Sequence, residues 1–266
     1  MRRYLAELIA SFIVVFAAAG AVVADVFLTH VRLADSFGPL GIVAAYALAV
    51  AIAMLVVMPV SGGHVNPVIT VSAYVARRIS LADAGGYLVA QLAGAVLAAF
   101  VLKGIVPKTA FQFASGGAPG LAQGISVLKG SLVELVLTFL LAFTFWAVCL
   151  DGRGPRALAP FAVGAVIALG GLAGAAFTGA AMNPARWLGP ALASGQYGNW
   201  LVWVAGPLLG ALLGSLAYEA VFMVERVEPE EIGEVTVDEE EEPPVLEAPA
   251  EAGTPTEAAP GAGAEG

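Results

Sequence analysis

The sequence predicts an all-α membrane protein with six transmembrane helices and two re-entrant half-helices, and two observations support that prediction. The first is composition: the 266 residues are 59% hydrophobic and 12% charged, with a mean hydropathy of +0.86, well above the range of soluble globular domains. The second is a repeated start signal, since Asn66-Pro67 and Asn183-Pro184 each open a short apolar segment, one in each half of the chain. Short segments at corresponding positions of two halves indicate a substrate pathway near the middle of the membrane.

The spanning helices are predicted from uninterrupted apolar runs of sufficient length. These runs fall at residues 4–27, 39–59, 83–105, 127–150, 158–177 and 200–224. The segment after Asn183 reaches only to about Ser194, and about eleven residues at 1.5 Å each cover half of a hydrocarbon layer of roughly 30 Å. Proline at a first helical position loses only an N–H that would be unpaired anyway, so each Asn-Pro pair predicts an N-cap followed by a helix.

An internal repeat relates the two halves of the chain. The pattern that starts at Glu7 recurs at Glu134, and the two Asn-Pro segments and the Gln91 and Pro207 regions follow in the same order. Three spans per half place the second half in the membrane from the opposite side, so residues 1–224 are predicted to be one channel domain with inverted repeats of about 1–105 and 127–224. A cleaved signal peptide ending near residue 21 is the alternative for the first span, and the repeat argues against it.

The net charge of −9 is concentrated in one segment. Fourteen of the 21 acidic residues follow residue 224, so residues 225–266 are predicted to form a disordered acidic cytoplasmic tail, a solvated extension rather than a partner-binding segment. Basic residues next to the spans favour one side of the membrane, which predicts that both termini are cytoplasmic. The first side has Arg2, Arg3, Arg77, Arg78, Arg153, Arg156 and Arg226, and the other has Arg32, Lys103, Lys108 and Lys129. Tyr197, Trp200 and Trp203 are expected in an interfacial aromatic belt.

Enzymatic and metal-binding functions lack support in the sequence. The single cysteine, Cys149, rules out an internal disulfide or a cysteine metal cluster. His64 has no second His or Cys at ligand spacing, which leaves a metal or proton-relay role without support. No set of general acid, base and nucleophile appears, and no cofactor, metal or nucleic-acid partner is expected.

The six spans, two half-helices and paired Asn-Pro boxes resemble the aquaporin or major intrinsic protein family over about residues 4–224. The first box departs from the family's Asn-Pro-Ala, because Val68 stands in the place of alanine, and this departure concerns the packing behind the asparagine and not the fold class. The resemblance implies half-helices that meet at their N-termini in the middle of the bilayer. It also implies a homotetramer with one pore per subunit, which we expect in the cell membrane.

Asn66 and Asn183 are the expected pore asparagines. In the family, each caps its own half-helix and directs its side-chain N–H into the pore, where it can donate to a water oxygen while the helix N-terminus repels cations. The alternative is that both are caps only. The irregular backbone before each box can be tolerated at membrane depth if its carbonyls face water. The expected pore-lining backbone is Gly62, Gly63, His64, Val65, Gly179, Ala181 and Met182.

Glu7 and Glu134 lie within apolar segments, where a carboxylate is costly and usually functional. Their matching positions favour one shared role, and the family resemblance implies that they accept N–H bonds from the irregular loops. Glu7 could instead extend to the membrane surface.

The resemblance also implies a selectivity filter made of Tyr46, Gly171, Ala180 and Arg186. A buried arginine repels cations and donates to passing solutes, whereas the alternative is that its side chain extends to the surface. Gly171, where water channels of the family usually have histidine, is expected to open the filter, but Ala180 and Trp187 are typical of water channels.

The predicted function is therefore a passive channel for water that excludes protons and ions, with glycerol, urea and ammonia as further candidate solutes. A proton-coupled secondary transporter is the alternative, with Glu7 or Glu134 as the coupling group. Both carboxylates stand away from the Asn-Pro boxes in the sequence, which argues against that alternative.

Overall fold

The computed structural model describes residues 1–31 and 35–223, and every regular element within them is helical. Contacts group residues Met1–Val224 into one compact unit, while the predicted acidic tail lies outside the described residues. Six helices in the described ranges are long and apolar enough to span a membrane, which confirms the predicted fold class. They are α1 (Arg2–Val31), α2 (Gly38–Ser61), α4 (Leu81–Ile105), α6 (Val127–Phe145), α7 (Ala159–Thr178) and α9 (Leu201–Phe222). A π-helical turn, Trp146–Leu150, extends α6.

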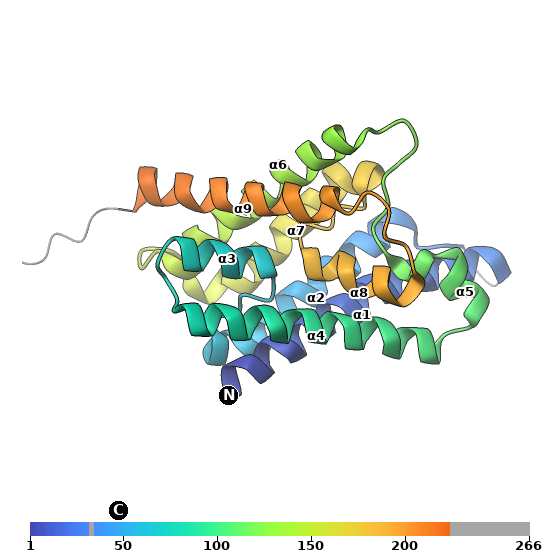
Figure 1. The fold of residues 1–266 in the computed structure, drawn as a ribbon, viewed down its shortest axis with the longest axis horizontal. Helices are drawn as coiled ribbons and strands as arrows, with labels where there is room; N and C mark the ends of the chain where they lie inside the picture. The colour runs from blue at the N-terminus through green and yellow to red at the C-terminus, as the bar shows by residue number, and fades with distance from the viewer. Residues whose placement is uncertain (32–34, 224–266) are drawn as a thin grey trace, which may run out of the picture. The chain divides into compact units, whose positions relative to one another are not determined.

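The two half-helices are α3 (Pro67–Val75) and α8 (Pro184–Ser194). Both start at the predicted caps: the Asn66 side chain accepts the N–H of Val68 at 3.1 Å, and the Asn183 side chain accepts those of Ala185 and Arg186 at 2.9 and 3.3 Å. Figure 1 shows α3 and α8 between α4 and α9, and the two half-helices are in contact with each other.

Helix pairs in the two halves pack in the same way. The helix α1 packs on α4, and α6 packs on α9. A side chain at Gly94 would collide with the backbone of Leu8, and one at Gly210 would collide with the backbone of Leu135. These two glycines therefore bring helices of the same chain into close contact.

The connection between α4 and α6 contains two short elements that the sequence analysis did not predict. They are α5 (Lys108–Phe113) and a 3₁₀ turn (Ser115–Gly117) that contacts α1 and α8. Six residues are too few for a helical hydrophobic period to be recognised. This connection matters because it reaches the functional site.

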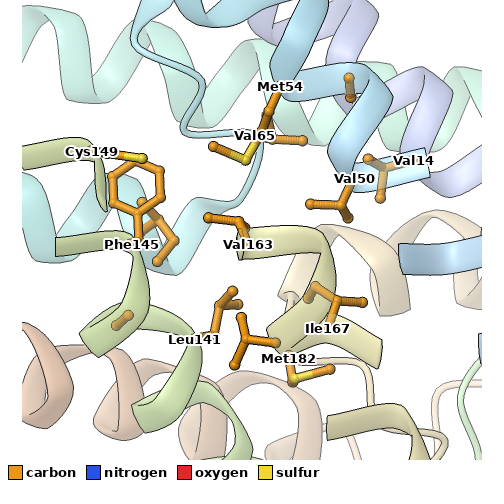
Figure 2. Close-up of a cluster of buried hydrophobic side chains, with 14 of the residues drawn as sticks. Val14, Val50, Met54, Val65, Leu141, Phe145, Cys149, Val163, Ile167 and Met182 are labelled. Carbon is orange, nitrogen blue, oxygen red and sulfur yellow. The ribbon is translucent and has the colours of Figure 1, made fainter. Parts of the chain in front are cut away.

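Side chains from α1, α2, α6 and α7 form the main apolar cluster, together with residues of both irregular loops. Figure 2 shows Val163 of α7 near its centre, with Val65 and Met54 on one side and Leu141 and Met182 on the other. The core thus joins the loops before α3 and α8 to the spanning helices.

One aromatic expectation was wrong. Tyr197 and Trp200 are half exposed, as an interfacial belt requires, but Trp203 is buried. Its indole N–H donates to the carbonyl of Thr178 at 2.9 Å, and its ring stacks on Trp187. Trp203 therefore supports the loop before α8 instead of anchoring the chain at the membrane surface.

Polar pairs tie together the elements near the end of α9. Glu219 accepts two bonds from the Arg78 guanidinium at 2.8 Å and one from the Trp146 indole at 2.9 Å. In the loop after α6, the Arg153 side chain and backbone N–H donate to the carboxylate of Asp151 and hold its pKa well below its usual range.

Candidate functional site

The two loops that precede the half-helices share an unusual backbone. Gly62 and Gly179 end α2 and α7 with φ values of 87° and 78°. Three residues further on, Val65 and Met182 have φ values of 57° and 49°. A β-branched residue such as valine rarely adopts positive φ, and the conformation costs of order 1–3 kcal/mol. Strong tertiary contacts must therefore hold these loops in place.

Glu7 supplies those contacts to the first loop. Its Oε1 accepts the Ser61 hydroxyl at 2.6 Å and the His64 N–H at 3.1 Å. Its Oε2 accepts the Val65 N–H and the Gln91 amide, both at 2.7 Å. Four bonds use the full acceptor capacity of a carboxylate, so Glu7 is saturated inside the protein and does not extend to the surface.

Glu134 makes the corresponding bonds in the second half. Its Oε1 accepts the Thr178 hydroxyl at 2.7 Å and the Ala181 N–H at 2.9 Å, and its Oε2 accepts the Met182 N–H at 2.7 Å. Glu134 is fully buried. Each loop is thus folded around one buried carboxylate from a neighbouring helix.

The two asparagines link the loops to each other as well as capping their helices. The Asn66 side-chain N–H donates to the Met182 carbonyl at 2.8 Å, and that of Asn183 donates to the Val65 carbonyl at 3.4 Å. A primary amide has two N–H donors, so each asparagine keeps a second one. The carbonyls of Met182 and Val65, in contrast, already accept hydrogen bonds from these asparagines.

Two cavities adjoin the irregular loops, and Tyr46 borders both. The wide cavity has a volume of about 370 Å³, and the expected filter residues Tyr46, Gly171, Ala180 and Arg186 all line it together with Gly179. The narrow cavity measures only about 20 Å³, which is room for about one water at a time. It is lined by Tyr46, Val50, Met54, His64, Val65, Asn66, Ile69, Leu141, Phe145, Val163, Ile167 and Asn183.

Some of the expected residues do not line these two cavities, although the structure describes them all. Gly62, Gly63, Ala181 and Met182 are not among the residues that line either cavity, and neither are the two glutamates. His64 lines the narrow cavity, and its Nδ1 lies 3.1 Å from the Thr70 hydroxyl. That contact holds the His64 ring in place at the edge of the narrow cavity.

Arg186 is buried, with only 4% of its surface exposed, and does not extend to the surface. Its Nη1 donates to the Gly117 carbonyl at 2.8 Å, and its guanidinium carbon lies 5.8 Å from the centre of the Tyr46 ring. Gly117 was missed in the sequence analysis. The run Ser115-Gly116-Gly117 signals only a turn, and nothing in it indicates which side chain the turn will meet.

Tyr46 has a role that its position in the sequence did not suggest. Its hydroxyl donates to the Ala181 carbonyl at 2.7 Å, across α2 and the second loop. The carbonyl of Ala181, part of the expected pore-lining backbone, is therefore already bonded to a side chain of the expected filter.

Tyr46→Phe tests that bond. We expect a loss of about 0.5–1.5 kcal/mol of stability, because a buried hydrogen bond is removed, while water flux persists because the aromatic ring that borders both cavities is kept. Thermal unfolding in detergent and stopped-flow light scattering of proteoliposomes would measure the two effects. Loss of water flux in a well-folded Tyr46→Phe protein would contradict the expectation.

Cys149 lies in the π-helical turn after α6, and only 7% of its surface is exposed. Figure 2 shows it beside Phe145, which lines the narrow cavity, but the thiol does not line either of the two described cavities. Because the sulfur is covered, we expect water flux to resist mercurial reagents. Inhibition that disappears in Cys149→Ser would show that the thiol is reached from the pore.

In the part of the chain that the structure describes, six spanning helices, two half-helices and a small cavity lined by both asparagines together have the architecture of a membrane channel. The chain matches the family model "Major intrinsic protein" over residues 1–218. It is 40% identical over 224 residues to "Aquaporin TIP1-2" of Zea mays, covering 83% of this chain and 86% of that protein. It is 36% identical over 226 residues to "Aquaporin TIP2-1" of Arabidopsis thaliana, covering 84% and 88%. The chain belongs to the major intrinsic protein family, and it is a channel and not an enzyme.

A solved structure shows the same fold. The "X-ray structure of the aquaglyceroporin from Plasmodium falciparum" aligns with a TM-score of 0.72 at 24% identity and covers 83% of this chain and 96% of that one. At this identity the likeness establishes the architecture, and the solute must be argued from the filter.

Proposed function

We propose that this protein is a passive channel that conducts water in single file and excludes protons and other ions. The two asparagines, each hydrogen-bonded to the opposite loop, support this proposal most directly. Asn66 and Asn183 both line the narrow cavity, each with one N–H bonded across to the opposite loop and one remaining. A water at this point can accept the remaining N–H of each asparagine beside the partial positive charge of both helix N-termini, and it then cannot pass a proton along an unbroken chain. The relatives named aquaporins are consistent with this function.

Glycerol, urea and ammonia are secondary solutes in this proposal. The wide cavity contains the expected filter residues, whose spacing decides which of these solutes enter, and among the described residues only Arg186 places a charged donor in it. The narrow cavity of about 20 Å³ has room for about one water at a time, which suits single-file passage of water. Water is therefore the primary substrate.

In this proposal, residues 1–224 form a single channel domain made of inverted repeats of about 1–105 and 127–224. The matching roles of Glu7 and Glu134 support that division. We place the channel in the cell membrane with both termini in the cytoplasm and expect a homotetramer. The six spans found in the described residues put both ends of the channel domain on one side, and the basic residues favour that side as cytoplasmic.

The transporter alternative finds no support in the geometry. A proton-coupling carboxylate must exchange protons with the solute path, whereas Glu7 accepts four bonds from protein donors and Glu134 accepts three. Neither lines the two described cavities. A passive channel explains these bonds without a coupling step.

The purified protein in proteoliposomes tests the function. Stopped-flow shrinkage should show rapid water flux, slower glycerol and urea flux, and no proton leak above that of empty vesicles. A pH gradient should not drive any of these solutes uphill. Uphill uptake of a neutral solute would refute the channel mechanism, and water flux no faster than in empty vesicles would refute the proposed substrate.

A further inference from the structure

The side chain of Val43 in α2 fills the space beside Gly171 of α7. A Cβ added to Gly171 would lie 2.7 Å from Cγ1 and 2.8 Å from Cγ2 of Val43, far inside the 3.4 Å at which ordinary contact begins. The absence of a side chain at residue 171 therefore does not leave open space. The expectation that Gly171 opens the filter needs this correction.

Close packing of α2 against α7 explains the arrangement. Gly164 lies two turns before Gly171 on the same face of α7. A Cβ there would meet the Ala47 carbonyl at 2.9 Å and the Ala51 methyl at 3.0 Å. Two glycines thus let the helices approach closely, and this approach carries Val43 toward residue 171.

Val43 is also part of the solute path. It lines the wide cavity, one helical turn from Tyr46, and is 7% exposed. Gly171 and Arg186 line the same cavity. The cavity thus has a charged donor in Arg186 and an apolar isopropyl group in Val43.

We propose that Val43 is a specificity-determining residue of this channel and that it acts as a unit with Gly171. Its two methyl groups form the wall that residue 171 lacks, and they set the width available to a solute at the filter. Because the wall is apolar, it offers no hydrogen bond to compensate a solute for lost hydration, so it acts by size. This inference rests on the proposed function, since it concerns which neutral solutes pass.

The first test compares Val43→Ala with Val57→Ala in proteoliposomes. Val57→Ala removes the same two methyl groups from the same helix, at a buried residue that lines neither described cavity. Val43→Ala should raise the ratio of glycerol to water permeability by roughly tenfold or more, since tenfold is the lower end of the effect expected when a fitted site changes by a single methylene. Val57→Ala should leave the ratio unchanged.

A second test measures the contact between Val43 and Gly171 by protein stability, without a transport assay. Gly171→Ala should lower the midpoint of thermal unfolding in detergent by roughly 4–8 °C, because its methyl group overlaps Val43. In the double variant Val43→Ala, Gly171→Ala, the midpoint should return to that of Val43→Ala alone.

The outcomes separate the two proposals. If the wild type conducts water but Val43→Ala leaves the solute ratio unchanged, or Val57→Ala changes it equally, Val43 does not determine specificity. If the double variant is not rescued, the pairing is refuted. If the wild type conducts no water, the proposed function fails, and the inference about specificity fails with it even where the thermal rescue shows that the two residues pack together.

Discussion

Glu134→Ala is expected to abolish correct folding of the second loop and, with it, water flux. The variant leaves the N–H groups of Ala181 and Met182 without the acceptor they have at 2.9 and 2.7 Å, and it removes the partner of the Thr178 hydroxyl. Each buried donor without a partner costs about 1–3 kcal/mol, so the two N–H groups together cost roughly 2–6 kcal/mol. This is a large share of a typical stability of about 5–15 kcal/mol.

Glu134→Gln gives an intermediate result by the same reasoning. The glutamine keeps the shape and one acceptor oxygen, but its NH₂ group would face an N–H donor. We expect the thermal midpoint to fall in the order wild type, Glu134→Gln, Glu134→Ala, measured as the monodisperse fraction after heating in detergent.

Asp83→Asn is the control for a general effect of removing a carboxylate. Asp83 pairs with Arg3 at the surface, where an ion pair contributes only about 0–1 kcal/mol. If Glu134→Ala were no less stable than Asp83→Asn, the carboxylate would not be holding the loop.

Arg186→Val is expected to preserve water flux and to admit cations. The guanidinium is the charged group in the wide cavity, and its fixed positive charge repels a cation at about 4 Å by about 4 kcal/mol at an effective dielectric constant of about 20. Losing that repulsion changes cation occupancy by roughly a thousandfold. The two helix N-termini at the asparagines remain as a second barrier, so the leak should be measurable but incomplete.

The matched control is Arg186→Lys, which keeps the charge but cannot reproduce the planar guanidinium and its contacts with Gly117 and Tyr46. It should retain ion exclusion. Proton leak is read from a pH-sensitive dye inside vesicles that also report water flux. If the Arg186→Val protein had normal water flux and no added ion leak, Arg186 would not be part of the ion barrier.

The spans and both half-helices could be predicted from the sequence because their signals are local. A run such as 127–150 is apolar enough to span a bilayer wherever the rest of the chain lies. Asn183 followed by proline starts a helix through bonds to the next few residues, and α8 begins and ends where that signal and Gly195 predict. The correspondence of Glu7 with Glu134 could also be predicted, because an internal repeat is found by comparing the two halves of the same sequence.

The roles of individual filter groups were decided only by the tertiary structure, because they depend on residues far apart in the chain. Tyr46 donates to Ala181, and Arg186 donates to Gly117 in a connection with no recognisable signal. Gly171, read alone, predicts an open filter, yet the close approach of α2 and α7 places Val43 there. Hydropathy and capping determine which segments cross the membrane, whereas side-chain volumes and hydrogen-bond partners, known only once the helices have packed, determine what can pass between them.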